Sequence, residues 1–282
     1  MRRIALVVLV AVLGTSGCRC ACGGESGTDA APGTDASPPG TDALPPGTDA
    51  LPPGTDAAPP STDAGPAAVT LACWDASRGG AFYASGGADF ATARANIEAE
   101  FSVTWVELAD LAGLATSGAQ GVVLSAIASG AGGITPLSPS EQTALAGFVT
   151  AGGFAILLAD NDVSFDASSD SLVAPFGLTA SGTIPADDTG TVTMAHPITA
   201  GVTTFDVGWP TSISDPGATG LVLGTTALGP LIVVIEEGAL APGSGVVVIF
   251  GDGTPWHGGW VLANSAAHTA LLLQALHHAS GL

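Results

Sequence analysis

A proline-rich repeat near the start of the chain limits folding more than any other feature of the sequence. The residues Gly-Thr-Asp-Ala recur from positions 27, 33, 40, 47 and 54, and ten of the 20 prolines lie between Pro32 and Pro66. Such a stretch has almost no large apolar side chains, so it cannot bury enough surface to offset the entropy cost of ordering it. Proline and evenly spaced aspartates favour an extended chain. We therefore expect residues 18–66 to be an unfolded stalk with a reach on the order of 100 Å, and residues 67–282 to hold the folded domain.

The residues before the stalk have the pattern of an export signal. Arg2 and Arg3 supply positive charge, and residues 4–13 form an apolar run that is too short to span a bilayer but has the length of a signal-peptide core. We expect residues 1–17 to be a signal peptide.

Residues 13–18, Leu-Gly-Thr-Ser-Gly-Cys, resemble the lipobox of bacterial lipoproteins, although Thr15 stands where such boxes usually carry Leu. The resemblance implies acylation of Cys18, with cleavage by ordinary signal peptidase as the alternative. Several acyl chains would tether the protein to a membrane without a spanning helix. Arg19 is not the aspartate that retains lipoproteins at the inner membrane, so the outer membrane is the expected location. Cys20 and Cys22 complete a C-x-C-x-C run that lacks the second ligand pair of a structural zinc site.

The charge of the chain excludes two classes of partner. Lys+Arg number 5 against 25 Asp+Glu, which gives a net charge of -20. Nucleic acid and anionic lipid head groups would both repel such a chain.

The domain alternates strand and helix patterns in its first half. Apolar residues recur at helical spacing in residues 89–101, whereas residues 121–127 form a short apolar run of the kind buried in parallel sheets. Ser138-Pro139-Ser140-Glu141 has the pattern of a capping box that starts a helix ending at Gly152. Further strands are expected at residues 69–74, 102–106 and 154–159. This order predicts an α/β fold, a doubly wound and mostly parallel sheet with helices on both faces.

The second half of the domain has more strand character. Strands are expected at 189–194, 221–225, 231–235 and 246–250, followed by a helix at 265–279, and a short helix is expected at 169–174. Little helix separates these strands, so we expect antiparallel additions to the sheet.

A ligand site in such a sheet lies outside the carboxyl ends of the strands. The residues that follow the expected strands are acidic and aromatic, and they form our candidate ligand-binding set: Asp75, Asp160, Asp162, Asp252, Trp256, His257 and Trp260. Aromatic faces beside carboxylates suit a saccharide or a cationic ligand. The alternative is that these aspartates satisfy turns while the tryptophans close the end of the core.

Two groups of residues have features of a metal site. Asp160, Asp162, Ser164 and Asp166 place oxygens at alternate positions, as a calcium loop requires, but Phe165 and Ser171 occupy the places where an EF-hand needs Gly and Glu. His277 and His278 are adjacent on the last helix, so they point about 100° apart and do not easily share a metal. No cofactor other than calcium is expected.

Three segments of the domain resemble the class I glutamine amidotransferase-like superfamily, in particular its branches without amidotransferase activity. These segments are residues 135–160, residues 196–202 with the sequence His-Pro-Ile-Thr-Ala-Gly-Val, and residues 248–252. The resemblance implies a flavodoxin-like sheet. Amidotransferases use a Cys-His-Glu triad, and this chain has none of the three in place. Cys73 lies on the first strand and not on a tight strand-to-helix turn, and no His-x-Glu occurs near the C-terminus.

Function follows from these expectations only as a class. No G-x-S-x-G elbow, H-E-x-x-H motif or P-loop occurs in the chain. We expect a lipoprotein of the cell envelope that presents a non-catalytic domain on a flexible stalk and binds an envelope saccharide or a protein. The alternative is an envelope hydrolase that uses Asp160, Asp252 and His257 on a saccharide or peptide.

Overall fold

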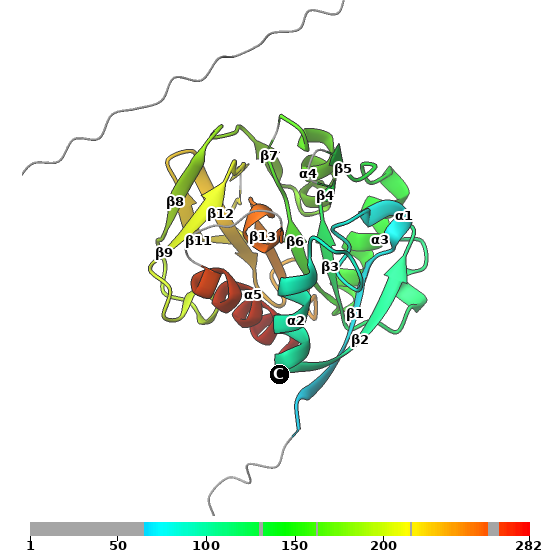
Figure 1. Cartoon of the computed structure of the whole chain (residues 1–282). Helices are drawn as coiled ribbons and strands as arrows, with labels where there is room; N and C mark the ends of the chain where they lie inside the picture. Colours follow the sequence, from blue (N-terminus) through cyan, green and yellow to red (C-terminus); the bar gives the residue numbers. More distant parts are fainter. Residues whose placement is uncertain (1–64, 130–131, 162, 215, 259–264) are drawn as a thin grey trace, which may run out of the picture. The chain divides into compact units, whose positions relative to one another are not determined.

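The computed structural model describes residues 65–129, 132–161, 163–214, 216–258 and 265–282 (Figure 1). The predicted signal peptide and stalk lie outside the described residues, apart from residues 65 and 66, and so do Cys18, Asp162 and Trp260. The strands are β1 (Ala67–Trp74), β2 (Phe101–Leu108), β3 (Gly121–Ser125), β4 (Ile127–Ser129), β5 (Gly132–Gly133), β6 (Phe154–Leu158), β7 (Thr179–Ser181), β8 (Asp187–Val192), β9 (Thr204–Gly208), β10 (Ser212–Ser214), β11 (Gly220–Thr226), β12 (Gly229–Ile235) and β13 (Val247–Phe250). The α-helices are α1 (Ala76–Gly79), α2 (Ala91–Glu100), α3 (Pro139–Thr150), α4 (Asp166–Val173) and α5 (Ser265–Ser280), and the short 3-10 helices are η1 (Leu114–Thr116), η2 (Ala174–Phe176), η3 (Pro197–Thr199) and η4 (Thr254–Trp256).

One mixed sheet organises the domain. Its nine strands have the order β2-β1-β3-β6-β13-β12-β11-β8-β9. The first five run parallel, and β12, β11, β8 and β9 then pair antiparallel. Counted in chain order, the parallel strands are arranged 2-1-3-4-5, which is the flavodoxin-like order. The predicted doubly wound sheet with antiparallel additions is confirmed.

Helices cover both faces of this sheet because alternate residues of each central strand point to opposite sides. On one face Leu71, Ile156 and Val248 join a core with Ile97 of α2 and Leu272 of α5. On the other face the core contains residues of β1, β3, β6 and β13 together with residues of α3 and α4: Ala72, Leu124, Leu157, Ile249, Leu145, Phe148 and Leu172. Figure 1 shows α2 and α5 side by side over the first of these faces.

The capping box at the start of α3 is confirmed. Ser138 Oγ accepts from the Glu141 backbone N–H, and the Glu141 carboxylate accepts from the Ser138 N–H. Such an N-cap contributes about 1 kcal/mol to stability. The helix therefore starts where its own residues specify.

Several short strands have no counterpart among the predicted elements. β9 extends the sheet at its edge, β7 pairs with β10, and β4 pairs with β5. These strands have two to five residues, too few for a periodic apolar pattern to mark them. Within the described part of the chain, no helix combines the length and apolarity needed to cross a bilayer.

Candidate functional site

Two buried aspartates lie at the carboxyl ends of the neighbouring strands β6 and β13. Asp160 is 1% exposed and Asp252 is 2% exposed. Asp160 accepts hydrogen bonds from the Asn161 backbone N–H, the Asn161 side-chain amide and the Gly253 N–H, at 2.8, 2.7 and 3.1 Å. Asp252 accepts from the Gly208 N–H at 2.7 Å and the Thr254 N–H at 2.8 Å. The two carboxyl groups therefore join the ends of β6, β9 and β13.

Burial dominates the protonation of this pair. It raises the pKa of Asp160 to about 7, although the backbone N–H groups of Asn161 and Gly253 act in the opposite direction. Burial also raises the pKa of Asp252, and the nearby Asp160 carboxylate raises it further. Two like charges so close in a dry site cannot both ionise cheaply, so the pair holds a proton near neutral pH.

A small pocket of about 170 Å³ opens beside Asp160. Its lining comes from four segments of the carboxyl edge: Ile127, Asp160, Asn161, Ser164, Phe165, Trp209, Thr254 and His257. We call it the rim pocket. His257 stacks on Phe82 with ring centroids 5.3 Å apart, and its Nε2 lies 3.3 Å from the Asp89 carboxylate. The rim pocket thus combines one protonatable carboxyl group, one imidazole and one indole.

Trp209 is the aromatic residue with an exposed surface among the lining residues that sequence reasoning missed. It is 37% exposed and has a backbone φ of 60°. A bulky residue in the left-handed region is strained, and such strain gathers at functional sites. The signal available in the sequence was an aromatic residue in a turn, between Gly208 and Pro210. A residue before proline normally has an extended backbone, so the left-handed conformation of Trp209 could not be predicted from this pattern.

The predicted ligand-binding residues that the structure describes have three kinds of surroundings: the rim pocket, the core and a local turn. Asp160 and His257 line the rim pocket, and Asp252 is close enough to Asp160 for the Asp160 charge to raise its pKa, although Asp252 does not line the pocket. Trp256 needs correction, because its indole is 6% exposed, packs on Phe250 and donates to the His268 carbonyl. Here the alternative interpretation, a tryptophan that closes the core, holds.

Asp75 serves a local turn. Its carboxylate accepts from the backbone N–H groups of Ser77 and Arg78 as the N-cap of α1. The side-chain hydroxyl of Ser77 also donates to it and lowers its pKa. Asp75 therefore lies outside the rim pocket.

The described members of the calcium candidate, Asp160, Ser164 and Asp166, lie between the end of β6 and the first turn of α4. Asp160 is occupied by the hydrogen bonds above, the Ser164 backbone donates to the Asn161 side chain, and Asp166 begins α4. Asp162 is outside the described residues. The loop is held by hydrogen bonds between its own residues.

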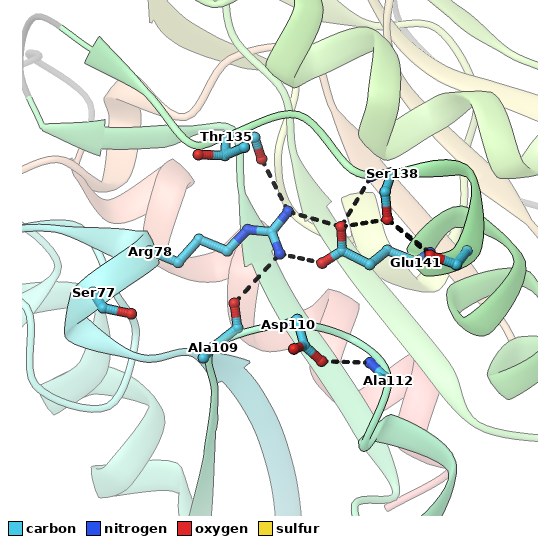
Figure 2. Close-up of a pocket in the computed structure, with 9 residues that line it drawn as sticks. Ser77, Arg78, Ala109, Asp110, Ala112, Thr135, Ser138 and Glu141 are labelled. Carbon is cyan, nitrogen blue, oxygen red and sulfur yellow. Dashed lines mark hydrogen bonds and ion pairs between the residues drawn. The ribbon is translucent and has the colours of Figure 1, made fainter.

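A second, larger pocket of about 500 Å³ lies at the carboxyl ends of β1 and β2 (Figure 2). Arg78 extends across it to the Glu141 carboxylate and also donates to the Thr135 carbonyl at 2.9 Å. The Arg78 guanidinium lies 4.1 Å from the centre of the Trp74 ring. Burial would raise the pKa of Glu141, but the hydrogen bonds from Arg78 and Ser138 outweigh it and hold that pKa at about 2. Arg78 is the only cationic side chain among the described residues that line this pocket, and it is already paired with Glu141.

The cysteine of the first strand offers no nucleophile to either pocket. Cys73 has an exposed fraction of 0%, and burial raises the pKa of its thiol. A reactive cysteine needs a lowered pKa and access to solvent.

Comparisons with known proteins bear on the fold. No family model matches the sequence, and no curated protein matches it either. Among solved structures, the mmIFT52 N-terminal domain has a TM-score of 0.55 and 9% identity, over 75% of this chain and 97% of that one. This likeness shows the fold alone.

Two further solved structures are similar at lower scores. A protein from Thermoplasma acidophilum, described as a candidate component of GMP synthase, has 12% identity and a TM-score of 0.46, over 74% of this chain and 95% of that one. A protein described as ThuA-like from Parabacteroides merdae has 14% identity and a TM-score of 0.46, over 77% and 91%. These scores carry no argument about the activity of this chain.

Proposed function

We propose that this protein is an exported lipoprotein, anchored to the outer membrane through Cys18, whose domain binds a ligand without catalysis. The observation that carries the proposal is the chemistry of the rim pocket. Its carboxyl group is held by three hydrogen bonds from backbone and amide donors, while Trp209, 37% exposed, lines the same pocket. A group held in this way orients a ligand better than it attacks one.

The ligand class follows from size and lining. The rim pocket measures about 170 Å³, well below the roughly 300–1,000 Å³ of pockets that enclose drug-sized ligands. It suits a single ring or side chain at the end of a larger partner. An indole face beside amide and hydroxyl groups favours a sugar ring, so an envelope saccharide is the proposed ligand and a protein side chain the second choice. The net charge of -20 disfavours anionic partners.

An envelope hydrolase is the alternative, and one observation favours it. Asp160, with its pKa raised to about 7, shares the rim pocket with His257, as an acid-base pair would. However, Asp252 is not among the residues that line the rim pocket, and its carboxylate accepts from two backbone N–H groups. Of the two aspartates in the predicted hydrolase set, only Asp160 therefore lines this pocket.

Binding and turnover can be measured on the same protein. The full chain would be titrated with soluble envelope saccharide fragments by calorimetry, and the products analysed after overnight incubation. We expect binding without cleavage, and at least a tenfold loss of affinity in Trp209→Ala. Trp105→Ala is the matched control, because Trp105 lies on β2 and donates to Glu98 away from the rim pocket. Cleavage that disappears in Asp160→Asn would establish the hydrolase instead, and equal affinity in both tryptophan variants would remove the proposed site.

Anchoring can be tested separately by metabolic labelling with a fatty-acid analogue. Label should be incorporated by the wild type and by Cys20→Ser, but not by Cys18→Ser, which should leave the membrane fraction. Label retained by Cys18→Ser would refute the assignment of this residue.

A further inference from the structure

Two histidines and a glutamate from separate segments meet at the edge of the sheet opposite the rim pocket. His196 is the N-cap of η3, Glu236 directly follows β12, and His278 lies in the last turns of α5. The end of β12 pairs with the start of β13, which places the cluster at the amino ends of the parallel strands.

The geometry brings three potential metal-ligand atoms to one point. His196 Nε2 lies 2.7 Å from one Glu236 carboxylate oxygen, and His278 Nε2 lies 2.9 Å from the other. All three ligand atoms lie within 4.8 Å of one another. A metal ion needs three or more His, Cys, Asp or Glu side chains close together. Among the described residues, this is the one group that has that spacing.

From this arrangement we propose that His196, Glu236 and His278 form a binding site for a divalent transition-metal ion, Zn²⁺ being the best match. Two imidazoles and one carboxylate are a ligand set that zinc takes, with a fourth position left for water. Bonds of about 2.0–2.2 Å in a tetrahedron separate neighbouring ligand atoms by about 3.4 Å. The contacts of 2.7 and 2.9 Å between the imidazoles and the Glu236 carboxylate therefore need to open slightly, which is a side-chain adjustment.

The three side chains of the cluster are partly exposed, which leaves room for them to adjust around an ion. The side chains of His196, Glu236 and His278 are 9, 34 and 21% exposed, so the cluster is shielded but open on one side.

One hydrogen bond opposes metal binding. His196 Nδ1 accepts from the Ile198 N–H at 3.2 Å, which places the ring proton on Nε2. Ligation through Nε2 moves that proton to Nδ1 and breaks this bond. A long, neutral hydrogen bond is a small loss beside three metal-ligand bonds. The ion would then cross-link η3, the end of β12 and α5.

The test measures Zn²⁺ binding to the full chain by equilibrium dialysis. We expect one equivalent bound at this site, with affinity at least tenfold weaker in His278→Asn. His277→Asn is the matched control, because His277 is the preceding residue of α5 and pairs with Glu100 instead. Zn²⁺ should also raise the Tm of the wild type and of His277→Asn, and leave that of His278→Asn unchanged.

The cysteine run at residues 18–22 is the competing site. Co²⁺ bound to the wild type distinguishes the two, because nitrogen and oxygen ligands give no sulfur-to-cobalt charge-transfer band. This readout needs no variant, so it stands even if a variant fails to fold. The proposal is overturned by a sulfur band from the only bound equivalent, by equal affinity in His277→Asn and His278→Asn, or by no binding at all. None of these results depends on a ligand at the rim pocket.

Discussion

Replacing Asp160 by asparagine should change how the stability of the domain depends on pH. Burial raises the pKa of this carboxyl group from 3.8 to about 7. The folded state therefore keeps the proton across a pH window in which the unfolded state has released it. Because the folded state binds more protons in this window, the free energy of unfolding falls as the pH rises.

The size of the effect follows from the width of the window. The slope for one proton is about 1.4 kcal/mol per pH unit and becomes shallower close to the folded-state pKa, so the wild type should lose about 2 kcal/mol between pH 5 and pH 7 from this group. Asparagine has nearly the same shape and does not titrate. Asp160→Asn should therefore gain about 2 kcal/mol relative to the wild type between pH 5 and pH 7.

Urea unfolding at the two pH values, followed by tryptophan fluorescence, measures the difference. Ser169→Ala is the control, because the Ser169 hydroxyl bonds the backbone N–H and C=O of Asp160 and leaves the carboxylate in place. Its loss of stability, about 1 kcal/mol, should be the same at both pH values. A gap between wild type and Asp160→Asn that changes by less than about 1 kcal/mol, or that changes in the opposite direction, would refute the raised pKa.

Three further substitutions, the last with a matched control, test other parts of the structure by urea or thermal unfolding. Glu141→Gln leaves the buried Arg78 guanidinium, 8% exposed, without its charged partner and should cost roughly 3–5 kcal/mol; in the wild type, this stabilisation should be present above pH 4.5 and be lost as the pH falls towards 2. A loss below about 1 kcal/mol would show that Arg78 does not need the carboxylate. Ser138→Ala removes the N-cap of α3 and should cost about 1 kcal/mol, whereas an unchanged midpoint would mean that packing alone sets the start of the helix. Gly80→Ala should cost about 2 kcal/mol or more, because φ is +56° and the added Cβ would lie 2.2 Å from the Ala128 carbonyl oxygen. Gly118→Ala, with φ of +75° and no atom within 4 Å of the added Cβ, should cost less, and equal losses would show that backbone strain alone matters.

Local signals predicted the elements whose causes are local. The capping box marks the start of α3 because its four residues satisfy their own backbone groups. The apolar runs at β3, β6 and β13 predict central strands because both faces of those strands are buried. The order of these elements was enough to predict the layered sheet, because short right-handed connections leave few arrangements.

Side-chain exposure at the carboxyl edge was decided by tertiary structure. Trp256 and Trp209 both follow strands closely, the first at the end of η4 after β13 and the second directly after β9, yet the first packs against Phe250 while the second lines the rim pocket. No local pattern distinguishes them, because the outcome depends on which neighbouring segment covers each ring.

The histidine cluster needed the fold even more. His196 and Glu236 are 40 residues apart, and His278 follows Glu236 by 42. The sequence by itself placed His278 on a helix, as α5 confirms, but it marked His196 only as the start of a His-Pro-Ile-Thr segment, and the structure shows His196 to be the N-cap of η3. Contacts between distant residues form when whole elements pack, so periodicity and spacing carry no record of them.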